Sequence, residues 1–148
     1  MRIIIGLLIL IAIIAGGLFV LGQKSKSGVA PGLTEGRLTP CPDSPNCVTS
    51  EAGADESHAV APLPADSWSA LGDIIGAMGG KIIVQNGTYI ASEFTSSAMG
   101  FVDDVEFRLA EDGVHVRSAS RVGRSDFGVN RKRVKKSVHG FLKPLRKL

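Results

Sequence analysis

Arginine, serine and asparagine side chains gather between residues 117 and 131, where a predicted strand gives way to a predicted helix. Guanidinium groups bind carboxylate or phosphate oxygens through two parallel hydrogen bonds. The N-terminus of a helix adds backbone N–H donors and the positive end of the helix dipole. This stretch therefore predicts an anion-binding surface. Its candidate ligand-binding residues are Arg117, Ser118, Ser120, Arg121, Arg124, Ser125, Asp126, Asn130 and Arg131.

Three carboxylates precede this stretch, Asp103, Asp104 and Glu106, and they give the arginines an alternative role. Paired with the carboxylates in a structural ion network, the arginines would have no charge left for a ligand. Acid–base or metal chemistry with His115 is a further option for the three acids. However, side chains alternate along a strand, so Asp103 points to the face opposite the other two. A structural role, with nearby serines or loop amides as partners, is the simpler interpretation of Asp103.

The sequence lacks the common catalytic and nucleotide-binding motifs. Its three histidines, His58, His115 and His139, lie outside any Gly-x-Ser-x-Gly nucleophile turn. It has neither a phosphate loop ending in Lys-Ser or Lys-Thr nor the glycine pattern of dinucleotide binding. We therefore assign no catalytic residue, no cofactor and no metal. An enzyme that uses the Asp/Glu and Arg cluster at 103–121 is kept as the alternative to a binding domain.

A charged hairpin would position most of these groups. Over residues 101–109 the odd positions are apolar apart from Asp103, and the even positions from 104 to 108 are charged, as in a strand with one dry face. Asp112-Gly113 is a turn signal, after which the chain returns as a second strand. A register with Glu106 opposite Arg117 pairs opposite charges, worth about 0.2–1 kcal/mol, and is the one we expect.

The remaining elements complete an α+β domain. A helix is predicted after a cap at Asp66 or Ser67 and ends at Gly79-Gly80. A second hairpin is predicted around Asn86-Gly87, and a basic helix is predicted from about residues 128–130. We expect an antiparallel four-stranded sheet, built from two consecutive hairpins, with two flanking helices on one face.

Residues 3–22 carry no charge and are numerous enough to cross a bilayer of about 30 Å. They predict a transmembrane anchor or, if cleaved before Gln23, a signal segment. In either case the domain is expected outside the cytoplasm, periplasmic or extracellular, and secreted if cleavage occurs. We divide the chain into the anchor or signal at 1–22, a flexible tether at 23–37 and one α+β domain at 38–148.

The two cysteines, Cys41 and Cys47, lie in a proline-rich stretch that predicts a rigid irregular loop. A disulfide between them would suit an oxidising compartment. Two free or buried thiols are the alternative. A zinc site is disfavoured, because two cysteines supply half of a zinc ligand set and no histidine is close in sequence.

Charge is unevenly distributed along the 148 residues, whose net charge is +3. Residues 38–112 carry two basic and twelve acidic side chains, whereas residues 113–148 carry eleven basic and one acidic. We expect the two parts to neutralise each other within the fold. Any remaining positive charge, including the last helix, could face anionic lipid. Nucleic acid is not an expected partner, because only 5% of the residues are aromatic and available to stack on bases.

Three runs are similar to a known family: CPDSPNCV at 41–48, FVDDVEF at 101–107 and RSASRVGRSDFGVNRKR at 117–133. They closely resemble the domain of unknown function family 1499, over about residues 38–140. The resemblance implies a small domain that often follows a signal or membrane segment, in bacteria and in plastid-bearing eukaryotes. It implies no activity, because the family has no catalytic assignment.

Taken together, these features predict a membrane-tethered extracytoplasmic binding or accessory domain. The membrane is its expected partner through residues 3–22, and its Arg-rich surface would take an anionic small molecule, a lipid headgroup or an acidic partner. The alternatives are the enzyme considered above and a purely structural domain whose charges are matched internally. The sequence gives no indication of oligomeric state.

Overall fold

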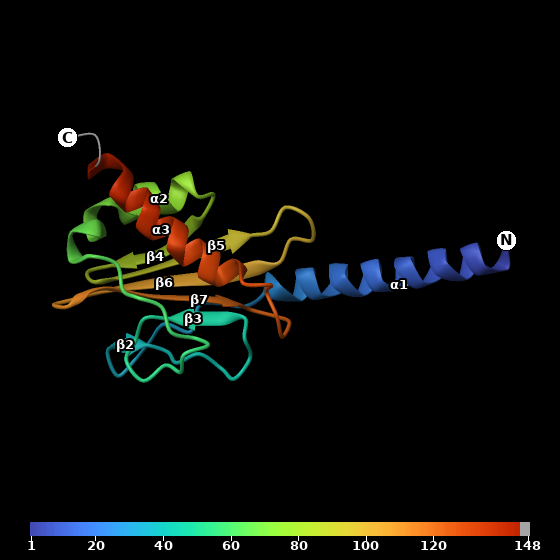
Figure 1. The fold of residues 1–148 in the computed structure, drawn as a ribbon, viewed down its shortest axis with the longest axis horizontal. Coiled ribbons are helices and arrows are strands. Elements are labelled where there is room, and N and C mark those ends of the chain that lie inside the picture. The colour runs from blue at the N-terminus through green and yellow to red at the C-terminus, as the bar shows by residue number, and fades with distance from the viewer. Residues whose placement is uncertain (146–148) are drawn as a thin grey trace.

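The computed structural model describes residues 1–145, with the backbone alone for residues 142–145; the last residues of the predicted domain, 146–148, lie outside the described part. A long helix, α1 (Arg2–Ser25), projects from a unit of mixed helix and sheet (Figure 1). The sheet is antiparallel and five-stranded, in the order β3-β7-β6-β5-β4. Its strands are β3 (Cys47–Thr49), β4 (Lys81–Asn86), β5 (Tyr89–Thr95), β6 (Val102–Ala110) and β7 (Gly113–Ser120).

Two hairpins form the body of this sheet, as predicted. The first joins β4 to β5 through the turn that follows Asn86, and the second joins β6 to β7. In the second hairpin Glu106 lies opposite Arg117, which is the register that charge pairing favours. Its apolar residues, Val105 and Phe107 among them, face the main core. Alternation of residue types therefore predicted the strand, and pairing of opposite charges predicted its register.

The prediction of four strands was wrong, because β3 adds a fifth. Cys47 to Thr49 pairs with β7 at one edge of the sheet, where an irregular loop was expected. The three prolines of this stretch, at 40, 42 and 45, all precede the strand, so none removes a hydrogen bond from the ladder. The edge position needs pairing on one side only, which a three-residue strand can provide.

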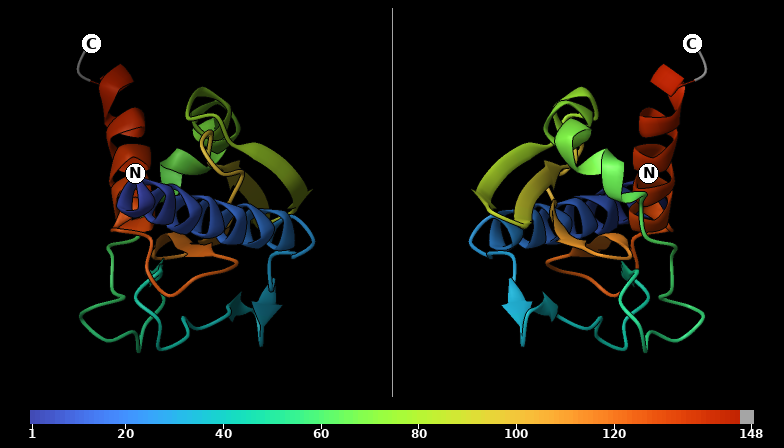
Figure 2. Two further views of the ribbon diagram at one scale, coloured as in Figure 1. Left: turned by 90° about the vertical axis from the view of Figure 1, so that its right-hand side faces the viewer. Right: turned by 90° about the vertical axis from the view of Figure 1, so that its left-hand side faces the viewer.

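The helices other than α1 lie on one face of the sheet (Figure 2). The helix expected from residue 66 begins instead as a 3₁₀ segment, η1 (Ala65–Ala70), and continues as α2 (Leu71–Ala77). Pro64 precedes η1 without a side-chain cap, so neither cap that we expected is used. The last helix, α3 (Val129–Leu145), begins where it was predicted. The main core between these helices and the sheet comprises Val48, Leu63, Leu71, Ile75, Ile90, Phe94, Val105, Phe107, Val114, Val116 and Val134.

The opposite face of the sheet is covered as well. It lies under residues 28–38, which include the short strands β1 (Leu33–Thr34) and β2 (Arg37–Leu38), and under the loop that follows β3 (Figure 2). The charged row on this face is consequently buried: Glu106 is 0% exposed and Asp104 is 4% exposed. Alternation indicates which side chains share a face, but it does not show whether another segment covers that face.

The segment predicted as a flexible tether, residues 23–37, makes specific contacts in the structure. Its first residues complete α1, and the backbone N–H of Gly32 donates to Glu106 Oε1 at 2.8 Å. Ser25 is fully buried, and its hydroxyl accepts a hydrogen bond from the N–H of Val102 at 3.0 Å. The composition rich in Gly, Ser and Lys resembles that of a linker, but these residues lie along the sheet.

Candidate functional site

Glu106 is the centre of a buried polar cluster on the covered face. Its carboxylate accepts hydrogen bonds from the Tyr89 hydroxyl at 2.7 Å, the Gly32 N–H at 2.8 Å and Arg117 Nη1 at 3.2 Å. Burial and the Glu106 carboxylate raise the pKa of Tyr89 well above its ordinary value, so the phenol keeps its proton and donates. The cluster ties the covering segment to β5, β6 and β7.

Arg121 forms a second cluster at the end of β7. Its guanidinium donates to both oxygens of Asp104 at 2.8 and 2.6 Å, to Glu93 at 2.6 Å and to the carbonyl oxygen of Ser25 at 3.1 Å. The hydrogen bonds from Arg121 to Asp104, and then to Glu93, raise the pKa of the guanidinium against the opposing effect of burial. Two carboxylates and the end of α1 therefore occupy this arginine.

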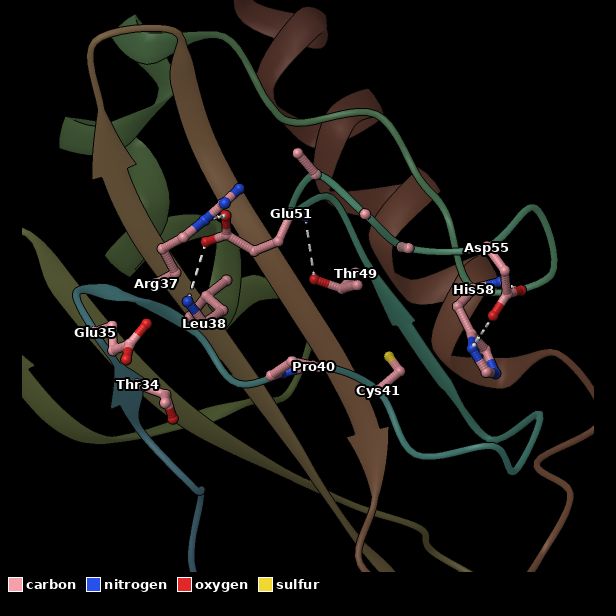
Figure 3. A pocket seen from close by; sticks show the side chains of 13 residues that line it. Thr34, Glu35, Arg37, Leu38, Pro40, Cys41, Thr49, Glu51, Asp55 and His58 are labelled. Atoms are coloured by element: carbon pink, nitrogen blue, oxygen red, sulfur yellow. Dashed lines mark hydrogen bonds and ion pairs between the residues drawn. The ribbon is translucent and has the colours of Figure 1, made fainter.

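Glu51 forms a third cluster, beside a cavity of about 290 Å³ (Figure 3). Arg108 donates to both of its oxygens at 2.8 and 3.0 Å, Arg37 to one at 3.0 Å, and the N–H of Leu38 to the other at 3.0 Å. Burial acts to raise the pKa of Glu51, but these hydrogen bonds outweigh it and lower the pKa to about 2. At the other side of the cavity, His58 Nδ1 lies 3.1 Å from Asp55.

On the helix face, a polar network joins β6 and β7 to α3. Ser118 donates to Asn130 Oδ1 at 2.6 Å, and Arg133 Nη1 donates to the Ser118 hydroxyl at 3.1 Å. Arg133 Nη2 donates to Asp103 at 2.6 Å, and the same guanidinium lies 4.8 Å from the centre of the Phe94 ring. Asp103 does point away from Asp104 and Glu106, as alternation predicted, but its partner is an arginine of α3 rather than a serine or a loop amide.

The sheet divides the candidate anion-binding residues. Arg117 and Arg121 belong to the covered face, whereas Ser118, Ser120 and Asn130 form part of the network on the helix face. Because the two groups lie on opposite sides of one sheet, they do not form a single convergent surface.

The other candidates lie in the loop after β7 and in the first turn of α3. Asp126 caps α3, accepting from the N–H groups of Gly128 at 3.0 Å and Asn130 at 2.6 Å. Ser125 accepts from the N–H of the residue two positions later at 3.3 Å. Arg131 donates to the Ala59 carbonyl at 2.7 Å, and Arg124 is exposed. These contacts fix the loop and the helix start, and of these side chains Arg124 is the exposed cation.

Ser50, His115 and Asp112 form a chain of contacts that separation in sequence conceals. The Ser50 hydroxyl lies 3.3 Å from His115 Nδ1, and His115 Nε2 lies 3.0 Å from Asp112. The order is that of a nucleophile, a base and an acid. However, Nδ1 lies closer to the Ser50 carbonyl oxygen, at 3.1 Å, and the Ser50 hydroxyl accepts from the N–H of Val116 at 2.8 Å. These hydrogen bonds fasten the end of β3 to β7, which is a structural role.

A basic groove of about 710 Å³ runs between α3, the end of β5 and the end of α2. Its apolar part comes from Met78, Phe94 and Val129, and its exposed cations are Lys132 and Lys136. Asp103 and Arg133 also line the groove, paired with each other. Neither lysine forms an ion pair with a carboxylate among the described residues. The sequence pattern pointed to the arginines and not to these lysines. The spacing of four residues between Lys132 and Lys136 places both on one side of α3, and this spacing could have identified them.

Cys41 and Cys47 form a disulfide, with sulfur atoms 2.03 Å apart. The disulfide closes the proline-containing loop directly before β3 and joins it to the sheet. Within the described residues, no group of three or more His, Cys, Asp or Glu side chains is placed to hold a metal ion. The disulfide thus decides between the two roles that the sequence left open for the cysteines.

No curated protein and no solved structure matches this chain. A family model described as "Protein of unknown function (DUF1499)" matches residues 37–141. The match spans the five-stranded sheet and α3 as far as residue 141. It agrees with the resemblance carried by the runs at 41–48, 101–107 and 117–133. The chain belongs to the DUF1499 family of proteins of unknown function.

Proposed function

We propose that this protein is a membrane-anchored domain, exposed outside the cytoplasm, that binds an anionic amphiphile in the groove beside α3. The anchor is α1, which is long and apolar enough to cross a membrane by length and composition. The Cys41–Cys47 disulfide supports an oxidising compartment for the domain. Together they favour an extracytoplasmic location.

The observation that carries the ligand class is the composition of the groove. Met78, Phe94 and Val129 provide apolar contact, and Lys132 and Lys136 provide exposed positive charge along one side. A ligand with an alkyl chain and an anionic head can satisfy both parts at once. A small hydrophilic anion would leave the apolar part of the groove uncovered.

The buried arginines support a lysine-lined site for the ligand, because carboxylates of the protein already pair with them. Arg117, Arg121 and Arg133 each form an ion pair with a carboxylate of the acidic half of the chain. Removing a buried arginine from its carboxylate to bind a ligand would leave an unpaired buried charge, at a cost of about 3–5 kcal/mol. The exposed lysines can bind an anion without that cost.

Titration calorimetry on the full-length chain in phosphatidylcholine nanodiscs tests the proposal. The probes are hexyl phosphate, which is the complete amphiphile, inorganic phosphate, which represents its anionic head, and hexanol, which represents its alkyl chain. We expect saturable binding of hexyl phosphate, tighter than that of either other probe. Lys132→Gln and Lys136→Gln should each weaken it about two- to fivefold, the effect of losing 0.5–1 kcal/mol from an exposed charge pair.

Lys135→Gln is the matched control, because Lys135 is an exposed lysine of the same helix that does not line the groove. It should leave hexyl phosphate binding unchanged. Equal losses in Lys135→Gln and Lys136→Gln would show that general charge, and not the groove, attracts the anion. Absence of saturable binding would overturn the ligand class.

A second candidate, a purely structural domain, is favoured by the ion pairs themselves. The covered face carries paired charges, with Arg121 joined to the end of α1 as well as to Asp104. On this view the charged layer serves to hold the domain on its anchor. Failure of all three probes to bind, in protein shown to be folded, would favour this candidate.

A further inference from the structure

The apolar part of α1 ends where the domain begins. Residues 3–22 form a helix of about 30 Å at 1.5 Å per residue, which matches the hydrocarbon thickness of a bilayer. Gly22 therefore lies at the boundary between hydrocarbon and headgroups. The headgroup layer extends about 5–8 Å further on each side. Ser25, three residues on, is still within that layer.

Two loops of the domain contact this end of α1. Gly22 packs against the carbonyl of Met99 so closely that a Cβ atom would not fit, which places the loop between β5 and β6 beside the helix. Arg121, which opens the loop between β7 and α3, donates to the Ser25 carbonyl at 3.1 Å. Figure 1 shows both loops at the end of the domain from which α1 projects. If α1 spans the bilayer, both loops begin within the headgroup layer.

The loop after β7 presents an aromatic side chain at this end. Phe127 is 88% exposed, and its φ of +53° is a left-handed conformation that non-glycine residues rarely adopt. Such a conformation costs about 1–2 kcal/mol. An exposed aromatic ring held at this position suits an amphipathic boundary with lipid.

The charge at this end is positive. The three segments that meet there, residues 22–28, 95–101 and 121–128, contain four basic residues and one acidic residue. Lys24, Lys26 and Arg124 are exposed. The acid, Asp126, is occupied in capping α3. Exposed cations beside an apolar side chain complement an anionic headgroup layer.

From these observations we infer that the end of the domain around Phe127 is a membrane-docking surface, seated on the leaflet from which α1 emerges. Its partner is a phospholipid surface containing anionic headgroups. Phe127 enters the boundary between headgroups and acyl chains, and Arg124 and Lys26 lie among the phosphates. This inference rests on the anchor in the proposed function, but it is independent of the groove and its ligand.

Tryptophan fluorescence of the full-length chain tests the docking, in nanodiscs of phosphatidylcholine and phosphatidylglycerol with or without brominated acyl chains. Phe127→Trp reports on the docking surface. Glu111→Trp is the matched control, because Glu111 is exposed in the β6–β7 turn at the opposite end of the domain (Figure 1). Trp68, the single native tryptophan, sets the baseline in the unaltered chain.

We expect the added tryptophan at 127 to emit at shorter wavelength and to lose intensity in brominated nanodiscs, while the one at 111 shows neither change. Equal behaviour of the two variants would overturn the docking. Flotation of proteoliposomes separates this failure from failure of the anchor. Protein that floats without quenching at 127 is anchored but not docked, and protein that does not float refutes the anchor itself.

Discussion

Glu51 shows how a single carboxylate can join three separate parts of the chain. It receives hydrogen bonds from β6 through Arg108 and from β2 through Arg37 and the N–H of Leu38. Its pKa of about 2, against an ordinary value of 4.5, means that the fold stabilises the ionised carboxylate relative to the protonated one. Protonation therefore opposes folding at this residue.

The direction of the pH dependence follows from that lowered pKa. Stability from Glu51 is fully present above about pH 4.5 and is lost as the pH falls toward 2, with at most about 3 kcal/mol at stake. Glu51→Gln should lower the free energy of unfolding by about 2–4 kcal/mol at pH 7, since it leaves two arginines without their shared carboxylate. It should also flatten the pH dependence between 4.5 and 2.

Urea unfolding of the full-length protein in detergent, followed by Trp68 fluorescence across this pH range, measures both effects. Glu56→Gln is the control, because Glu56 is exposed in the same loop. An unchanged acid slope in Glu51→Gln would mean that other carboxylates dominate the acid response.

Among the elements, α1 is joined to the domain more closely than a helix on a linker would be. Gly22 contacts the Met99 carbonyl, and Ser25 bonds to both Val102 and Arg121. A Cβ at position 22 requires the β5–β6 loop to move, because backbone atoms cannot give way as a flexible side chain can.

Gly22→Ala should therefore loosen this junction. We expect faster hydrogen exchange at the Val102 amide, whose acceptor is the Ser25 hydroxyl, and a loss of about 1–3 kcal/mol in unfolding free energy. Gly16→Ala is the matched control in the same helix, where a Cβ meets nothing within 4 Å. If both substitutions leave exchange at Val102 unchanged, the loop accommodates the added methyl group.

The sequence predicted the elements unevenly, and the reasons are physical. Alternating charge and apolarity identified β6 and β7, and opposite charges selected the register of Glu106 with Arg117. The same alternation could not show that residues 28–38 cover the charged row, because burial of that row depends on ion pairs between distant segments. The prolines before Cys47 concealed an edge strand, since a loop and a short edge strand tolerate the same residues.

For a similar reason the sequence predicted the paired arginines of the candidate site but not its exposed lysines. The arginines at 117 and 121 were correctly placed near carboxylates, but local sequence does not indicate which cations are left exposed after folding. Lys132 and Lys136 are ordinary residues of a basic helix. Only the packing of α3 against β5 and α2 turns them into one side of a groove.

For the whole molecule, the acidic and basic parts of the chain are joined mainly through the sheet. Pairs such as Asp104 with Arg121 and Glu106 with Arg117 are buried, so salt screens them less than exposed charges. Lys132 and Lys136, which are exposed, should respond to salt in the ordinary way.

A salt series distinguishes these two populations of charge. Between 0.1 and 1 M NaCl, where the Debye length falls from about 10 to about 3 Å, we expect the urea midpoint to change little and hexyl phosphate binding to weaken. The weakened binding in the same samples shows that screening is effective. A midpoint that falls steeply with salt would mean that the ion pairs are open to solvent.

The packing of Gly22 and Ser25 against the domain has a consequence for processing of the chain. A leader peptidase needs an extended backbone in its cleft, and the bond after Gly22 is helical, with buried residues on both sides of it at 22 and 25. Removal of the N-terminal segment would have to precede folding of the domain. Once β6 has closed on Ser25, we expect this junction to resist proteolysis.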